Sequence, residues 1–205
     1  MNIFFVDKDP VEAAHALADT HVRKMILESG QLLATAHWVL DGVSFKEKNA
    51  KGRWTTRFAH PDQFYDDNLI KPTHINHPCA VWIRADINNY YWLFRHFMAL
   101  LEEYNDRFDK PHKWDCLDHE LFDMIQGPPL NISGLNDPDE FDPRDAPVCM
   151  PDEYKTNRAL AGAKTSQELV FSYRNYYSVG KKHLHKYTKR QMPNWVEVHQ
   201  NRLVK

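Results

Sequence analysis

The stretch from Asp19 to Leu40 carries the clearest hydrophobic pattern of the chain. It contains no proline, and its apolar residues recur at spacings of three and four, as along one face of an α-helix. Asp19 is a residue type that caps the first turn of helices. The pattern predicts a long central helix. The predicted core face comprises Val22, Met25, Ile26, Ser29, Leu32, Leu33, Ala36 and Leu40.

A second, polar stripe runs along the same predicted helix: His21, Lys24, Glu28, Gln31 and Thr35. Its far side is bordered by apolar residues: Leu27, Ala34 and Trp38. The residues left to face outward are Arg23, Gly30 and His37. The polar stripe is therefore expected to be partly enclosed, and a half-buried Glu beside a Lys and a His is typical of groups tuned for proton transfer. The alternative is an ordinary solvated ion pair of Lys24 with Glu28.

Other periodic segments predict further helices. The chain starts with a short strand or extended tail, from Met1 to Val6, and Asp9 with Pro10 then favours a helix start. An aromatic helix is expected from Pro78 to about Phe108, and a shorter one from Trp114 to Ile125. Thr165 and Glu168 have the spacing of a capping box, ahead of a helix that continues towards Tyr187.

Two segments lack this periodicity, at about 41–70 and 127–160. The first is polar and rich in Lys and Arg, and the second holds many of the prolines and is acidic. With only seven glycines and no Gly-rich phosphate loop, a nucleotide-binding α/β fold is disfavoured. We expect a mainly α protein, with residues 1–205 forming a single-domain helical bundle that has long central helices and these two loop-rich insertions.

Composition narrows the class of protein further. The chain has 205 residues and 42% hydrophobic residues, and its mean hydropathy is −0.65. The apolar start from Ile3 to Val6 is too short for a signal peptide or a membrane span. The three cysteines are scattered and odd in number, which favours reduced thiols. We expect a cytoplasmic monomer that does not enter membranes.

The C-terminal region has an uneven charge distribution. No acidic residue occurs from Ser172 to Val196, where Lys and Arg alternate with Tyr and His. That pattern is typical of a surface that contacts phosphates and stacks bases, so double-stranded DNA is the expected partner. A solvated basic helix is the alternative. The candidate DNA-binding residues are Arg84, Lys181, Lys182, Lys186, Lys189 and Arg190.

Several residues offer metal-ligand chemistry: His74, His77, Cys79, Cys116 and His119. Their spacings match no zinc finger, so neither a metal nor another cofactor is expected. His77, just before Pro78, is better interpreted as a helix cap or a pocket residue, and Cys79 as a small core residue.

The segment Asp19-Thr-His21, with Glu28 seven positions after the His, resembles the catalytic helix of the pyrimidine-dimer DNA glycosylases, the phage endonuclease V superfamily. The aromatic segment 78–108 is similar in place to that family's central helix, and Pro193-Asn-Trp195 resembles its C-terminal Pro-Thr-Trp segment. The blocks MNIFFVDKDP, HVRKMILESGQLLATAH, KPTHINHP and MPDEYK also resemble a group of uncharacterised phage proteins of that superfamily.

This resemblance implies a DNA glycosylase that acts on a damaged or modified pyrimidine in a phage-infected bacterial cell. Glu28 would be the acid/base beside the sugar C1′ and His21 would orient the nucleotide. Lys24 would hold a phosphate or act as nucleophile. The implied substrate pocket is Gln31, His77 and Trp195.

The nucleophile is where the sequence departs from the family, whose members use the amine exposed when Met is removed ahead of a small residue. Asn2 is large, so Met1 is expected to stay. The Met1 amine, an imine on Lys24, or water activated by Glu28 remain open. Two other functions also remain open: a phage base-modifying transferase of the thymine-hypermodification kind, and a non-enzymatic nucleic-acid-binding protein in which Glu28 is structural.

Overall fold

A computed structural model describes residues 1–115, 120–134, 143–156 and 165–202 of the chain. These residues are mainly α-helical, and their only sheet has two strands. The prediction of a mainly α fold is confirmed, whereas its description as a single-domain bundle stays a prediction. None of the helices within the described ranges combines the length and apolarity needed to cross a membrane.

Helix α1 (Pro10–His15) and helix α2 (Asp19–Leu40) follow the extended N-terminal residues. As predicted, Asp9 caps α1 by accepting hydrogen bonds from the amides of Val11 and Glu12. Asp19 does not cap α2, because Ala18 is its N-cap and the Asp19 carboxylate instead binds Arg107 and Thr188.

The predicted core face of α2 is buried, except that Leu40 is half-buried. The outward face was predicted wrongly at two positions. His37 is buried, and Gly30 packs so closely that a Cβ there would lie 2.9 Å from the Trp114 ring. Leu27, expected at the border of an enclosed stripe, is 45% exposed. The burial at these two positions arises because Trp114 packs on Gly30 and Tyr90 on His37, in addition to the partners of the predicted core face.

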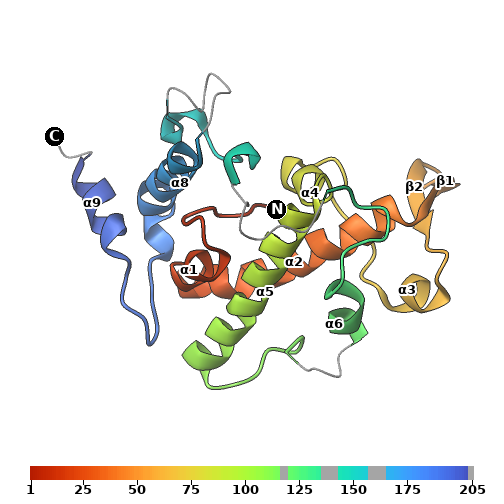
Figure 1. Ribbon diagram of the computed structural model, residues 1–205, viewed down its shortest axis with the longest axis horizontal. Helices are drawn as coiled ribbons and strands as arrows, with labels where there is room; N and C mark the ends of the chain where they lie inside the picture. Colours follow the sequence, from red (N-terminus) through yellow and green to blue (C-terminus); the bar gives the residue numbers. More distant parts are fainter. Residues whose placement is uncertain (116–119, 135–142, 157–164, 203–205) are drawn as a thin grey trace.

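The aromatic segment forms two helices instead of one, α4 (Pro78–Ile83) and α5 (Ile87–Phe108). The break occurs because Asp86 is extended and caps α5, accepting from the amide of Asn88. Helices α2 and α5 each have 22 residues and cross near the middle of the molecule (Figure 1). The N-terminal residues Ile3 to Val6 are buried beside this crossing.

The first insertion is more ordered than a loop. It forms an antiparallel hairpin, β1 (Val43–Lys48) and β2 (Trp54–Ala59), followed by α3 (Gln63–Asn68). The predicted helix 114–125 is described as α6 (Glu120–Ile125), while residues 116–119 lie outside the described part. In the second insertion, the described residues include two 3₁₀ turns, η1 (Pro143–Asp145) and η2 (Asp152–Tyr154).

The C-terminal region begins with α8 (Ser166–Asn175), where the predicted capping box of Thr165 and Glu168 is confirmed. The helix does not continue to Tyr187. A π turn, η3 (Tyr176–Gly180), a 3₁₀ turn, η4 (Lys182–Leu184), and an irregular segment lead to α9 (Asn194–Arg202). The basic residues between 181 and 190 therefore lie on turns and irregular backbone.

Candidate active site

Glu28, near the middle of α2, lies where the start of the chain meets that helix. Its side chain is only 13% exposed. Oε2 accepts a hydrogen bond of 3.0 Å from the backbone amide of Asn2 and lies 3.9 Å from the α-amino nitrogen of Met1. Oε1 lies 3.3 Å from Nζ of Lys24. One carboxylate is therefore placed between two amines.

Lys24 and Met1 differ in their surroundings. The Lys24 side chain is 59% exposed, and its neighbour Leu27 is exposed as well. The apolar enclosure predicted for the Lys24 amine is therefore not found, because Leu27 points to solvent. The Met1 side chain is 2% exposed. Of the two amines beside Glu28, the one on Met1 belongs to a residue held by the core.

His21 lies in the core. Its ring stacks on Phe4 with centroids 4.6 Å apart, and Nδ1 is 2.8 Å from the hydroxyl of Tyr177. Burial, followed by the positive charges of Lys181 and Lys24, lowers the pKa of His21 to about 4. The neutral ring is thus held by Tyr177 and Phe4, and its role in orienting a nucleotide stays a prediction.

His77 caps α4, one of the two roles that its position before Pro78 suggested. Its Nδ1 accepts from the amide of Cys79 at 3.2 Å. Burial lowers the pKa of His77, and among nearby charges the Met1 amine lowers it while Glu28 raises it. His77 is linked to Glu28 through Cys79 and Asn2, because the Cys79 thiol lies 3.9 Å from Oδ1 of Asn2 and the backbone amide of Asn2 donates to Glu28.

The sequence did not predict that Asn2, Cys149 and Tyr173 lie together beside Glu28. The Asn2 side chain donates to the carbonyl of Cys149 at 3.0 Å, and its Oδ1 lies 3.2 Å from the hydroxyl of Tyr173. The Tyr173 hydroxyl also accepts a hydrogen bond of 3.2 Å from the backbone amide of Cys149. These contacts anchor the residue that holds Glu28. The block MPDEYK, which starts directly after Cys149, was the available sequence signal for this region.

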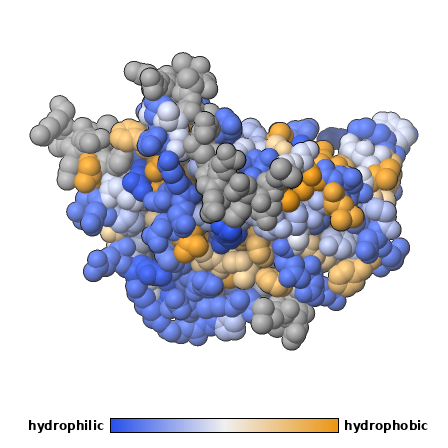
Figure 2. Space-filling view, in the orientation of Figure 1, coloured by the Kyte–Doolittle hydropathy of each residue, from blue (hydrophilic) through white to orange (hydrophobic). Residues whose placement is uncertain are grey.

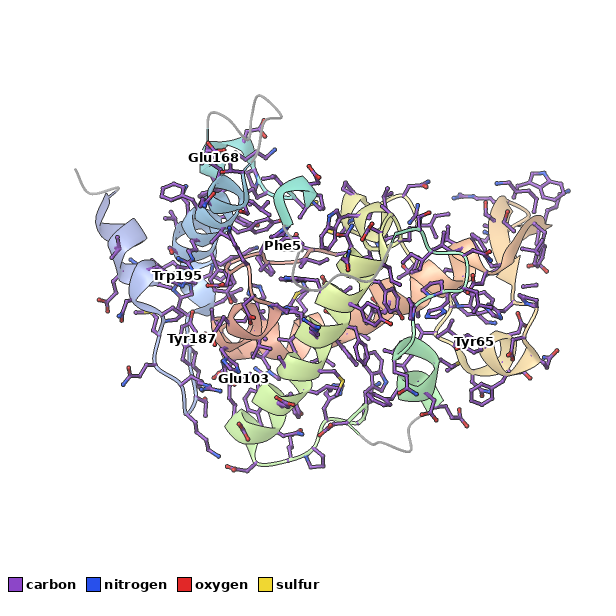
Figure 3. The ribbon with its side chains drawn as sticks, in the orientation of Figure 1. Phe5, Tyr65, Glu103, Glu168, Tyr187 and Trp195 are labelled. Atoms are coloured by element: carbon purple, nitrogen blue, oxygen red, sulfur yellow. The ribbon has the colours of Figure 1, made fainter. Side chains whose placement is uncertain are left out.

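The three predicted pocket residues are not in one place. Gln31 follows Glu28 by one turn of α2 and is half-buried, whereas His77 caps α4. Trp195 belongs to α9, where its ring packs against Tyr177 and under the guanidinium of Arg174, 5.3 Å from the ring centroid (Figure 3). Trp195 lines a separate hollow of about 600 Å³.

Most of the predicted DNA-binding cations are engaged within the protein. Arg190 pairs with the buried carboxylate of Glu103, and Lys189 pairs with Asp109. Arg84 donates to the carbonyl of Ile75 at 2.7 Å. Lys181 lies over the Tyr176 ring, 5.1 Å from its centroid. Lys189 and Arg190 therefore find their counter-charges outside the acid-free run, on Asp109 and Glu103.

Lys182 and Lys186 differ from those cations. Both are exposed, and neither forms an ion pair within the described part of the chain. Figure 2 shows a hydrophilic surface at the lower left, where the end of α5 meets the C-terminal segment. These two lysines are the members of the predicted DNA surface that remain available to phosphates.

The hairpin is a second cationic element, and its strands were not predicted. Every residue of β1 is exposed, and Trp54 of β2 is 66% exposed. Lys46 and Lys48 lie on the same face as Trp54, and the Lys48 ammonium is 5.2 Å from the Trp54 ring centroid. Arg53 lies exposed in the turn. An exposed aromatic ring among cations suits a nucleic-acid contact.

Comparisons of this chain with protein-family models, with curated proteins and with solved structures gave no match. The arrangement around Glu28 therefore has to be interpreted from its own geometry.

Proposed function

We propose that the protein is a DNA glycosylase that releases a damaged or modified pyrimidine, with Glu28 as its acid/base. The observation that carries the proposal is the half-buried Glu28 carboxylate, which lies 3.9 Å from the Met1 amine and 3.3 Å from the Lys24 amine. A carboxylate beside an amine is the pair that attack on a sugar carbon requires. The resemblance of His21 and Glu28 to the glycosylase helix supports the same chemistry.

One amine and the Glu28 carboxylate account for every bond and proton that changes in this reaction. The amine nitrogen forms a bond to C1′, the bond from C1′ to the base breaks, and the base leaves with the electron pair. A proton passes from the amine through Glu28 to the departing base. The C1′–O4′ bond then opens, the second amine proton moves to O4′, and an imine remains between the sugar and the protein.

Met1 is the nucleophile in this proposal. An α-amine is the better nucleophile at neutral pH, because a larger fraction of it is unprotonated than of a lysine side chain. Asn2 holds the backbone next to that amine through its 3.0 Å hydrogen bond to Glu28. The exposed Lys24 lacks the desolvation that would activate it. Intact mass of the purified protein checks that the Met1 amine is free.

Double-stranded DNA would contact the two exposed groups of cations. One is the hairpin, beside the C-terminal end of α2, and the other is Lys182 with Lys186, beside its N-terminal end (Figure 1). The 22 residues of α2 span about 33 Å at ~1.5 Å per residue. This length is about one turn of B-DNA, which is ~34 Å. Glu28 lies between the two groups along the helix.

Base release from defined duplexes tests the proposal. The probes are ultraviolet-irradiated DNA and DNA in which 5-hydroxymethyluracil replaces thymine. We expect the Glu28→Gln variant to lose at least about a hundredfold in single-turnover release, because Gln keeps the acceptor for the Asn2 amide but cannot transfer a proton. Lys24→Gln is the matched control and should keep most of the activity.

Borohydride trapping identifies the amine. An adduct that persists in Lys24→Gln and is lost when the α-amine is blocked supports Met1, and the reverse pattern moves the imine to Lys24. Release without any adduct leaves water as the nucleophile. Heavier bases with none released would indicate a transferase. Full activity in a folded Glu28→Gln variant, or DNA binding without any product, would reject the assignment of Glu28.

A further inference from the structure

Two thiols and an imidazole converge beside the start of α4. Cys79 is fully buried in the first turn of that helix, directly after Pro78 and its cap His77. Cys149 comes from the segment between η1 and η2, 70 positions later in the chain. One ligand-capable atom from each of the three residues lies within 4.8 Å of the other two.

The distance between the two sulfurs is informative. Sγ of Cys79 and Sγ of Cys149 are 3.8 Å apart. A disulfide needs about 2.05 Å. Two thiolates on one tetrahedral zinc ion, with bonds of about 2.3 Å, are separated by about 3.8 Å. The two sulfurs therefore have the spacing of metal ligands without any change in the backbone.

We propose that His77, Cys79 and Cys149 bind one divalent ion of the zinc type. Thiolate and imidazole are the ligands that zinc prefers, and three protein ligands leave a fourth position for a small exchangeable ligand. Each thiol gives up its proton when it binds, so the ion releases up to two protons into solution. No residue changes its oxidation state.

The surrounding contacts hold the two sulfurs in position. Oδ1 of Asn2 lies 3.9 Å from Sγ of Cys79, and the Asn2 amide group donates to the carbonyl of Cys149. The hydroxyl of Tyr173 accepts from the Cys149 amide and donates to the carbonyl of Pro147. Such outer contacts orient the ligands of protein metal sites.

The imidazole has to change its hydrogen bonding to take part. Nδ1 of His77 accepts from the Cys79 amide, and this hydrogen bond is broken whichever nitrogen binds the ion. Binding at Nδ1 occupies the same lone pair, while binding at Nε2 places the proton on Nδ1. The first turn of α4 would therefore respond to the metal.

The sequence did not predict this site, because Cys149 was not among the candidate metal ligands. Those candidates were chosen for pairs of His and Cys only three positions apart, whereas Cys149 is 70 positions from Cys79. The inference goes beyond the proposed glycosylase and does not depend on it, since metal binding is measured directly. It does place the ion beside the pair of Glu28 and Met1, because Asn2 contacts both groups.

Cobalt titration of the full-length, reduced and metal-free protein tests the site. We expect one Co²⁺ per chain, with thiolate-to-cobalt charge-transfer absorption that one equivalent of Zn²⁺ abolishes. Cys79→Ala and Cys149→Ala should each lower the affinity at least about a hundredfold. His77→Asn should also weaken binding, although Asn keeps the ability to cap α4. His183→Asn changes an exposed imidazole in η4 that is not one of the three ligands, and this control should bind normally.

Circular dichroism of each metal-free variant separates loss of binding from loss of folding. The proposal fails if the reduced protein binds less than one Co²⁺ per chain and shows no thiolate-to-cobalt charge-transfer absorption. It also fails if Cys79→Ala or Cys149→Ala, once shown to be folded, binds the metal as tightly as the unchanged protein. A cysteine pair that forms a disulfide and binds no metal when reduced would likewise reject it.

Discussion

Three histidines lie in the core, where each has a neutral oxygen as partner. His21 binds the Tyr177 hydroxyl, His37 binds the Tyr90 hydroxyl at 2.9 Å, and Nδ1 of His96 donates to the carbonyl of Pro10 at 2.8 Å. Burial lowers the pKa of each ring to about 4. All three rings are therefore neutral in the folded protein at pH 7.

Buried neutral histidines make stability depend on pH. An unfolded chain binds protons on histidine below about pH 6.5, while these rings stay neutral down to about 4. The unfolded state therefore binds more protons in this window, and the free energy of unfolding falls as the pH drops from 6.5 towards 4. Each histidine contributes up to about 1.4 kcal/mol per pH unit.

His96→Gln tests this dependence at one residue. Its amide can replace the hydrogen bond to Pro10 but does not titrate. We expect the slope of unfolding free energy against pH, measured by urea denaturation between pH 6.5 and 4.5, to decrease by up to about 1.4 kcal/mol per unit. An unchanged slope in a folded variant would show that the ring already takes up a proton in the native state.

Helix α2 shows how much of a functional site can be predicted from a sequence. Positions seven apart on a helix point in nearly the same direction, so His21 and Glu28 were correctly placed on one stripe of α2. What covers each position depends on segments far along the chain. Phe4 and Tyr177 enclose His21, whereas Asn2 reaches Glu28. Helical periodicity carries no information on those partners.

At the scale of elements, two of the predicted caps are confirmed, while Asp19 does not cap α2 and only α2 has the predicted length among the longer helices. The caps of α1 and α8 followed from Asp9 and from Thr165 with Glu168. The break between α4 and α5 also had a local signal in Asp86, but the continuous aromatic pattern on both sides concealed it. The hairpin lacked a usable pattern, because its strands have no buried face.

That lack of a buried face leads to a prediction for the hairpin. An isolated two-stranded hairpin is only marginally stable, and a β-ribbon of this width fits the major groove. We expect the triple variant Lys46→Gln, Lys48→Gln and Arg53→Gln to bind duplex DNA more weakly. The slope of log affinity against log salt should become shallower by about 0.9 for each phosphate that the variant no longer neutralises.

A double variant, Lys182→Gln with Lys186→Gln, removes the cations at the other end of α2, and its DNA affinity and salt slope are compared with those of the hairpin variant. Fluorescence anisotropy over a range of salt concentrations measures both variants against the unchanged protein. If the hairpin is the main DNA-binding surface, the triple variant loses more affinity and more of the salt slope than the double variant. A salt slope that only the C-terminal pair reduces would instead assign the DNA surface to the segment predicted from the sequence.

At the scale of the molecule, one buried ionic network joins distant segments. Arg107, near the end of α5, donates to the carboxylates of Glu103 and Asp19 and to the carbonyl of Leu17. Asp19 also accepts from the backbone and hydroxyl of Thr188. The network thus connects α2, α5 and the C-terminal segment, and Arg107 is the residue that its carboxylates share.

Both carboxylates stay ionised because the network outweighs their burial. Burial raises the pKa of Asp19, but hydrogen bonds from Thr188 and Arg107 lower it below its ordinary value. Burial likewise opposes ionisation of Glu103, whose pKa is nevertheless lowered by Arg190 and Arg107. Groups with a lowered folded pKa stabilise the fold above the unfolded pKa of about 4, and this contribution is lost as the pH falls below it.

Arg107→Met is therefore expected to be among the most destabilising single changes in the described part of the chain. Its side chain is fully buried, and Met fills similar volume but leaves the carboxylates of Glu103 and Asp19 without their shared partner. Removing one member of a buried ion pair typically costs about 3–5 kcal/mol. Arg190→Met is the matched control, and it should cost less because that side chain is 40% exposed.

Urea denaturation at several pH values distinguishes the loss of charge pairing from the loss of packing at Arg107. If lost charge pairing dominates, the difference between Arg107→Met and the unchanged protein shrinks as the pH falls, because protonated carboxylates no longer need the arginine. A difference that is constant with pH would instead assign the effect to packing.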